Sequence, residues 1–229
     1  MNFLILDVGT SSMRGILFRA NGEMLHTVQK TYQVITLDHG WVEQNPLDFK
    51  DHMTTIVKES AAWAGEHGET IDAVALTSQR SSVIPVDEHG NHLGNAQMWQ
   101  DKRTVPMCKA MEKHHREIFE LCGSRVNPVF SGAKMKWMWQ NQPDLYEKAY
   151  KLTVIPDYLV YHMTGEFATD WTYGSRSLLM NLKTCQWDDR LLELFEVDKE
   201  KLCELHAPGS ILGRTTKAFA VETGLPEGT

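Results

Sequence analysis

The feature that most constrains the fold is a short apolar run near the N-terminus that stops at a carboxylate. Residues 3–6 contain no polar side chain, and Asp7 follows them directly. A short continuous apolar run that ends in turn residues is typical of a buried strand. The runs 14–18 and 24–34 then flank Asn21-Gly22, and Asn-Gly between two such runs strongly favours a β-hairpin. The sequence therefore predicts a three-stranded meander at the start of the chain.

Helical and strand patterns follow the meander. Asn45 offers an N-cap before a proline at the first helical position, and an apolar stripe continues to Gly65. This helix should cover the sheet, so that the predicted order begins βββαβ. Further strands are predicted over 71–77 and 83–86, and further helices over 102–121, 131–140, 156–163 and 188–195.

Composition limits the classes of function. With 229 residues, 42% of them hydrophobic and 23% charged, the chain can bury roughly 70% of its unfolded surface as one packed α/β domain. The net charge of -7 argues against binding nucleic acid, because neutralising phosphates requires a surplus of Lys and Arg. No apolar run approaches the roughly 18 residues of a membrane span, and residues 1–6 are too short for the core of a signal peptide and have no cationic segment before them. We expect a cytoplasmic protein with no membrane partner.

The cysteines do not indicate a metal or disulfide framework. The four of them are scattered, with no C-x-x-C pair and no histidine at ligand spacing. This pattern fits reduced thiols and makes a structural zinc site improbable. They are Cys108, Cys122, Cys185 and Cys203.

The turn after the first strand is the first candidate site. Gly9 lets the backbone approach a ligand closely, and Thr10, Ser11 and Ser12 bring N–H and O–H donors that can face one anion. Asp7 places a carboxylate where it can hold Mg²⁺ through water, so the combination suits the phosphates of Mg-ATP. No G-x-x-x-x-G-K-[ST] sequence occurs, which excludes a P-loop. The alternative is an ordinary hairpin turn that happens to contain Asp and Ser.

Six segments in this order resemble the FGGY carbohydrate kinases, a family within the actin, Hsp70 and hexokinase ATPase superfamily. The first has the form D-x-G-T-x-S-x-R and ends at Arg14, which the resemblance adds to the phosphate site. The resemblance runs over nearly the whole chain. The segments are 7–14, 40–46, 78–80, 99–104, 130–134 and 169–176.

The resemblance implies a ribonuclease H-like α/β fold, with a mixed five-stranded sheet flanked by helices and with helical insertions. Residues 1–229 would be the N-terminal substrate- and phosphate-binding domain, and the C-terminal nucleotide-binding domain would be absent from this chain. ATP and Mg²⁺ are the implied cofactors. The implied reaction is the ATP-dependent phosphorylation of a hydroxyl of a polyol, or of a ketose such as xylulose. A homodimer is left open.

The resemblance also implies that the catalytic group is missing. The general base of the family is an aspartate a few residues beyond the point that Thr229 matches, so we expect no catalytic residue in this chain. Residues 224–229 are turn residues where a further strand is expected. Since a general base contributes typically 10²- to 10⁴-fold, we expect negligible kinase activity from these 229 residues alone.

Four residues are implied to contact the sugar. In glycerol-kinase-like members an arginine in the stretch matched by Gln79-Arg80 binds polyol hydroxyls, and the fork of donors on Arg80 suits adjacent hydroxyls. Trp99 and Asp101 match a segment of xylulokinase-like members at the sugar site, which Arg103 of the same segment would help to form. Two alternatives stay open: Arg80 as the partner of an acid at the strand end, and Asp101 as a helix cap.

Two positions depart from the glycerol kinase pattern. Ser81 stands where an acidic residue is expected, and Val129 stands where an aromatic residue is expected. Losing a carboxylate acceptor for hydroxyls alters specificity strongly, because unpaired polar groups discriminate between substrates. The sequence therefore favours a larger polyol or a ketose over glycerol.

Other residues and other functions remain open. Trp41 and Glu43 lie either near the substrate cleft or in a staple at the entrance of the first long helix. Asp170 and Arg176 are expected to form a structural ion pair. One rival function is an Hsp70- or actin-like ATPase, which shares the phosphate turn but lacks the 78–80 and 99–104 segments. Another is a family member that binds sugar without catalysis.

Overall fold

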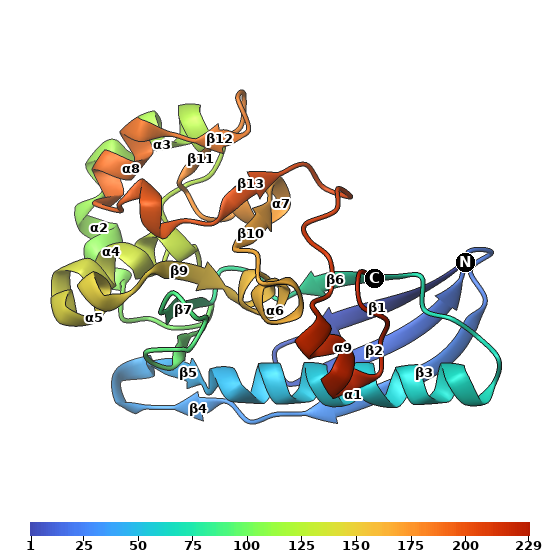
Figure 1. Cartoon of the computed structure of the whole chain (residues 1–229). Coiled ribbons are helices and arrows are strands. Elements are labelled where there is room, and N and C mark those ends of the chain that lie inside the picture. The colour runs from blue at the N-terminus through green and yellow to red at the C-terminus, as the bar shows by residue number, and fades with distance from the viewer.

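The predicted meander forms the first sheet of the computed structural model, which describes all residues from Met1 to Thr229 (Figure 1). Its antiparallel strands are β1 (Asn2–Val8), β2 (Ser12–Arg19) and β3 (Met24–Thr31). A fourth strand, β6 (Ala73–Ser78), pairs parallel to β1, which gives the order β3-β2-β1-β6. The meander and the 71–77 strand are thus confirmed.

The family resemblance implied a five-stranded sheet, but this sheet has four strands. β6 lies at its edge, because the strands that follow β6 pair elsewhere. They join the β4–β5 hairpin in a second sheet of order β4-β5-β8-β7-β9. Its strands are β4 (Ile35–Thr36), β5 (Val42–Gln44), β7 (Val83–Val86), β8 (Ala96–Gln97) and β9 (Lys151–Val154).

Two small ribbons complete the strand inventory. β10 (Ala168–Asp170) and β13 (Glu204–His206) pair parallel, and β11 (Met180–Asn181) and β12 (Gln186–Trp187) pair antiparallel. Most strands outside the first sheet have only two to four residues, which is too short to leave a periodic pattern in the sequence. Only β7 among them was predicted.

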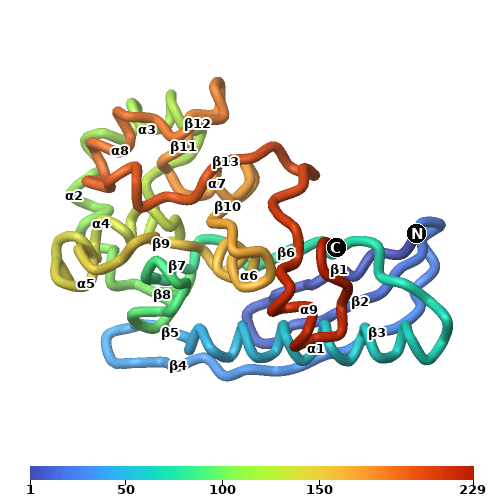
Figure 2. The backbone as a smooth tube through the Cα atoms, in the orientation of Figure 1, coloured from blue at the N-terminus to red at the C-terminus, as the bar shows by residue number.

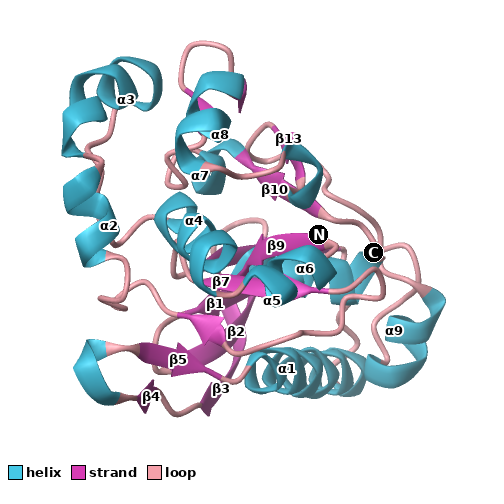
Figure 3. Ribbon diagram, turned by 90° about the vertical axis from the view of Figure 1, so that its left-hand side faces the viewer, coloured by secondary structure: helices cyan, strands magenta, loops and turns pink.

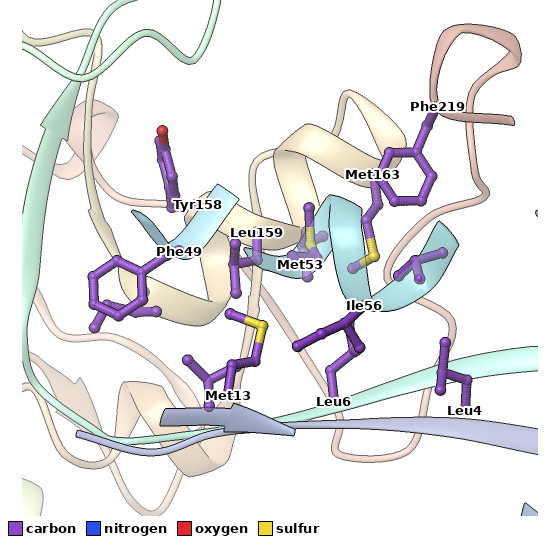
Figure 4. Close-up of a cluster of buried hydrophobic side chains, with 14 of the residues drawn as sticks. Leu4, Leu6, Met13, Phe49, Met53, Ile56, Tyr158, Leu159, Met163 and Phe219 are labelled. Carbon is purple, nitrogen blue, oxygen red and sulfur yellow. The ribbon is translucent and has the colours of Figure 1, made fainter. Parts of the chain in front are cut away.

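The longest helix, α1 (Pro46–Glu66), begins where the sequence predicts. The Asn45 side chain accepts a hydrogen bond from the backbone N–H of Leu47 at 3.1 Å, and Pro46 occupies the first helical position. Figure 4 shows Met53 and Ile56 of this helix above Leu6 of β1, with Leu159 of α6 (Ile155–Thr164) beside them. These side chains belong to one buried apolar cluster, so α1 and α6 together cover the first sheet.

The predicted helix over 102–121 is wrong in its continuity. It divides into α2 (Val105–Ala110), a 3₁₀ turn η2 (Glu112–His114) and α3 (His115–Cys122). Pro106 sits in the first turn of α2, where its missing N–H costs nothing, so the helix begins at Val105 rather than at Lys102. Only Cys108 in α2, and Ile118 and Cys122 in α3, are buried.

The other helices surround a second apolar cluster. Figures 2 and 3 show that residues 100–205, apart from α6, gather away from the meander, whereas the final helix returns to α1. The three helices predicted at 131–140, 156–163 and 188–195 are present. The remaining bounds are η1 (Asp38–Gly40), α4 (Ser131–Asn141), α5 (Pro143–Lys148), α7 (Trp171–Gly174), α8 (Asp189–Phe195), η3 (Lys199–Lys201) and α9 (Lys217–Thr223).

Candidate phosphate and sugar site

The turn between β1 and β2 is tight. The N–H of Gly9 donates to the carbonyl oxygen of Ser12 at 2.9 Å, and a Cβ on Gly9 would lie 3.2 Å from that oxygen. Asp7 and Arg14 face each other across the two strands, and Arg14 Nη2 lies 3.2 Å from Asp7 Oδ2. The half-exposed Asp7 carboxylate and the turn therefore open on the same end of the sheet.

Buried donors hold the carbonyl groups of the turn. The Tyr32 hydroxyl and Gln79 Nε2, the latter at 3.2 Å, both donate to the carbonyl of Gly9. Gln44 Nε2 donates to the carbonyl of Thr10 at 3.0 Å. Gln44 is 1% exposed and Tyr32 is buried, so these carbonyl groups point into the protein.

The N–H groups of the turn are correspondingly free. Those of Thr10 and Ser11 donate to no backbone or side-chain acceptor, and Ser11 is exposed. The hydroxyls of Ser11 and Ser12 also have no protein partner, whereas Thr10 Oγ1 accepts a hydrogen bond from Trp99 Nε1 at 3.1 Å. Successive free N–H groups on a turn form a concavity suited to an anion.

Gln79 serves the turn, which changes its expected role. Its Nε2 group lies 3.4 Å from Gln44 Oε1 in addition to bonding Gly9, and Thr10 Oγ1 lies 3.5 Å from its Oε1. These contacts engage both ends of the side-chain amide. In this structure Gln79 therefore supports the turn between β1 and β2 and is not a free sugar ligand.

Arg80 follows Gln79 and is exposed, with no acidic partner within 4.0 Å. The alternative of an ion pair at the strand end is thus excluded for this structure. The next residue, Ser81, is 3% exposed and has a positive φ of 71°. Its hydroxyl donates to the carbonyl of Arg176 at 3.1 Å, so it is not free to replace the expected carboxylate.

The expected ion pair between Asp170 and Arg176 does not form. Asp170 caps α7 instead, and its Oδ1 accepts from the N–H groups of Thr172 and Tyr173 at 2.7 and 3.2 Å. The Arg176 guanidinium stacks on the ring of Phe130, 4.5 Å from its centre. The first N–H groups of a helix have no partner within the helix and bind a carboxylate well. Asp170 therefore bonds the start of α7 instead of pairing with Arg176.

Asp101 is not available to a substrate in this structure. Its side chain has no exposed area, and it accepts hydrogen bonds from the backbone of Val42 and from Arg103. Arg103 also bonds Glu43 Oε1 at 2.7 Å and stacks on Trp41, 4.2 Å from the ring centre. Asp101 therefore holds the loop that carries Trp99. It does not cap α2, whose N-cap is Thr104, so the helix-cap alternative is wrong.

The loop before α4 is held by a buried lysine that the sequence did not single out. Lys134 Nζ donates to the carbonyl groups of Pro128 and Val129 at 2.8 and 2.9 Å. Burial lowers the pKa of Lys134 to about 7. The loop carries Val129, one of the two positions that depart from the glycerol kinase pattern. Lys134 ends the family segment 130–134, but the residue types around it do not indicate that its side chain is buried.

The residues present fit a magnesium ion held mainly by phosphate. Asp7 offers a carboxylate beside the turn, and no group of three or more His, Cys, Asp or Glu residues that could hold a metal occurs in the chain. Mg²⁺ usually keeps several waters and takes one or two carboxylates together with substrate phosphates. The half-exposed Asp7 matches that donor set.

A large cleft lies next to the site rather than in it. A space of about 440 Å³ runs along the edge of β6, between that strand and α6, and Gly228 and Thr229 line its other side. Figure 1 shows the C-terminus beside β6. Asp170 and Tyr173 line the same cleft, near the end of β6 that leads to Gln79 and Arg80.

The elements described above form an α/β domain of the actin and hexokinase-like fold class, with a tight turn after its first strand. The chain matches the model of the N-terminal domain of the FGGY family of carbohydrate kinases over residues 2–229. It therefore belongs to this family, as the six ordered segments indicated.

Curated relatives share about a third of the sequence. Glycerol kinase from Pseudomonas fluorescens (strain SBW25) is 31% identical over 230 residues, which cover 96% of this chain and 46% of the relative. Glycerol kinase from Thermococcus onnurineus is 35% identical over 219 residues, covering 93% and 44%. The chain thus spans about half the length of the curated relatives that it matches.

Solved structures agree in fold at lower identity. A gluconate kinase from Lactobacillus acidophilus superposes with a TM-score of 0.92 at 24% identity, covering all of this chain and 46% of that one. A xylulose kinase from Rhodospirillum rubrum gives 0.94 at 21% identity, covering 100% and 47%. None of the helices of the present chain combines the length and apolar character needed to cross a membrane.

Proposed function

We propose that this chain is the phosphate- and sugar-binding half of a cytoplasmic kinase that transfers the γ-phosphoryl group of ATP to a hydroxyl of a polyol or ketose. The observation that carries the proposal is the pair of free N–H groups at Thr10 and Ser11, in a chain that belongs to the FGGY family. Phosphoryl transfer depends mainly on positioning and on charge neutralisation, which such donors provide.

Each group of the turn has a defined task in this proposal. The N–H groups of Thr10 and Ser11 and the hydroxyls of Ser11 and Ser12 donate to the β- and γ-phosphate oxygens. Because Gly9 has no Cβ, the phosphates can approach the backbone of the turn closely. Arg14 adds a positive charge across from Asp7. Mg²⁺, when bound, would neutralise phosphate charge, with Asp7 holding one of its waters.

The sugar is assigned to the side of the turn that carries Arg80 and Trp99. Arg80 is exposed and has no protein partner, so its donors are free for adjacent hydroxyls. Trp99 is 37% exposed and bonds Thr10, which supports a position for its ring between the turn and the bound sugar. Because Ser81 is tied to Arg176 and Val129 is aliphatic, a ketose or larger polyol is favoured over glycerol.

An ADP-release assay tests the proposal in protein that carries this chain at the full length of its relatives. Glycerol, erythritol, xylulose, ribulose and gluconate are offered with Mg-ATP. We expect one of the longer substrates to be preferred over glycerol. ATP hydrolysis without any sugar dependence would instead favour the Hsp70- or actin-like rival.

The role of Arg80 is tested in the same assay. Arg80→Ala should raise KM for the preferred sugar by about tenfold or more, because a hydrogen bond from a charged donor contributes roughly 1.5–3 kcal/mol. Arg125→Ala is the matched control, since Arg125 is also exposed and also lacks an acidic partner. Equal KM values for the two variants would remove Arg80 from the sugar site.

A further inference from the structure

Gln44 has no assigned role, yet its side-chain amide is buried directly behind the phosphate turn. Its Nε2 group donates to the carbonyls of Thr10 and Gln33 at 3.0 and 3.3 Å, and its Oε1 lies 3.4 Å from Gln79 Nε2. The residue comes from β5, in the second sheet, whereas the turn belongs to the first sheet. Gln44 therefore connects the two sheets at the candidate site.

The geometry of the peptide bond gives this contact a directional effect. A trans peptide unit is planar, so its carbonyl and the N–H of the following residue point in opposite directions. The carbonyl of Thr10 and the N–H of Ser11 share one such unit. When Gln44 holds that carbonyl inward, the N–H of Ser11 has to point outward, where it has no protein acceptor.

The neighbouring peptide unit is held in the same way by other residues. The carbonyl of Gly9 shares its unit with the N–H of Thr10, and Tyr32 and Gln79 donate to that carbonyl. Burial, together with the nearby Asp7 carboxylate, raises the pKa of Tyr32, so its hydroxyl keeps the proton that it donates. The directions of the two outward N–H groups are thus set by different side chains: Gln44 for Ser11, and Tyr32 with Gln79 for Thr10.

We propose that Gln44 is a positioning residue of the phosphate site, which aims the N–H of Ser11 at the bound phosphate by holding the carbonyl of Thr10. This inference rests on the proposed function for its ligand, but the orientation of the peptide unit can be measured without one. It gives Gln44 a specific role beyond filling the space between the two sheets.

The test compares three variants of the 229-residue chain by NMR. Gln44→Met keeps the size of the side chain and removes both donors, and Tyr32→Phe removes the donor at Gly9. The matched control is Asn2→Leu, because Asn2 is also a buried amide with two side-chain hydrogen bonds, to Glu69 and Thr70 at 3.0 and 2.9 Å. Residual dipolar couplings report the directions of the Thr10 and Ser11 N–H bonds.

The expected result differs between the two turn variants. Gln44→Met should change the coupling of Ser11 and leave that of Thr10 close to wild type, whereas Tyr32→Phe should do the opposite. Asn2→Leu should change neither. A purely structural role for Gln44 would alter both couplings together or neither, and either pattern would overturn the proposal.

A titration with inorganic tripolyphosphate adds the functional readout. Gln44→Met should weaken its binding by about tenfold, the effect of losing one hydrogen bond that orients a donor. Unchanged affinity in this variant would also overturn the proposal. If tripolyphosphate does not bind the wild-type chain at all, the phosphate-binding function fails, and the Ser11 coupling alone then decides the role of Gln44.

Discussion

Charged side chains that are almost fully buried hold the loop that presents Trp99 to the candidate site. Arg103 is 2% exposed and Asp101 is 0% exposed, and both lie in the loop that presents Trp99. Their charges are matched by each other and by Glu43, and Trp41 and Trp137 stack on the guanidinium. Buried charges of this kind are tolerated only while every partner is present.

Replacing Arg103 should therefore be costly. Arg103→Met leaves Asp101 and Glu43 without their cation, and we expect the free energy of unfolding to fall by about 3–5 kcal/mol. Urea denaturation measures the change. Arg116→Met is the control, because Arg116 pairs with Glu120 on an exposed helix face, where such pairs contribute about 0–1 kcal/mol. Similar losses in the two variants would contradict the buried network.

Asp157 makes stability depend on pH. Burial raises its pKa from 3.8 to about 7, and Oδ2 accepts from the N–H of Val154 at 3.0 Å while Oδ1 has no partner. The folded state thus binds a proton that the unfolded state releases. The stabilisation is complete below the unfolded pKa and is lost as the pH rises through the folded pKa.

The matching variant is Asp157→Asn, which keeps the acceptor for Val154 but does not titrate. Relative to this variant, the wild-type chain should lose up to about 1.4 kcal/mol per pH unit in the window from 3.8 to about 7. Unfolding curves collected across this window measure the difference. Parallel stability profiles for the two proteins would show that Asp157 does not take up the proton.

At the scale of single elements, α4 is fixed by a close backbone approach. The N–H of Gly132, in its first turn, donates to the carbonyl of Ser177 at 2.8 Å. A Cβ on Gly132 would lie 2.5 Å from that oxygen. The contact sets the position of α4 against the segment that leads from α7 to β11, and hence the loop held by Lys134.

Gly132→Ala should destabilise the chain although alanine favours helices. The clash with the Ser177 carbonyl outweighs the propensity gain of about 1 kcal/mol. Gly65→Ala in α1 is the control, since nothing lies within 4 Å of the added Cβ, and it should raise the thermal midpoint. A rise in both variants would mean that α4 shifts without penalty.

Elements with strong local signals were the ones that the sequence predicted. The Asn-Gly hairpin and the Asn45-Pro46 helix start are encoded by adjacent residues, so they could be found without knowledge of the fold. The second sheet could not, because β4 and β8 have two residues each and form only through distant partners. The break between α2 and α3 was missed because the polar residues there suit an exposed helix as well as a turn.

For the whole molecule, the sequence indicated the family and predicted where the candidate phosphate turn lies, but not how the turn is oriented. Gln44 and Tyr32 act from other strands, and their contacts depend on how two sheets meet. Gln79 and Asp101 were assigned to the sugar from a resemblance that carries no information on hydrogen-bond partners. The structure engages both side chains within the protein.

The 229-residue chain should have negligible kinase activity by itself. It spans about half of the length of its curated relatives, and none of its residues is assigned as a general base. A coupled ADP-release assay with Mg-ATP and each candidate sugar measures this directly. Turnover of any polyol or ketose by the purified chain would show that a base within these residues suffices.

The outward N–H groups of the turn also affect which mutations the site tolerates. Every residue except proline carries the same N–H, so position 11 can change its side chain and still present a donor to phosphate. The buried amide at position 44 has no such freedom, because only its side chain reaches the Thr10 carbonyl. In a survey of random variants, the less forgiving position should be the one hidden behind the turn.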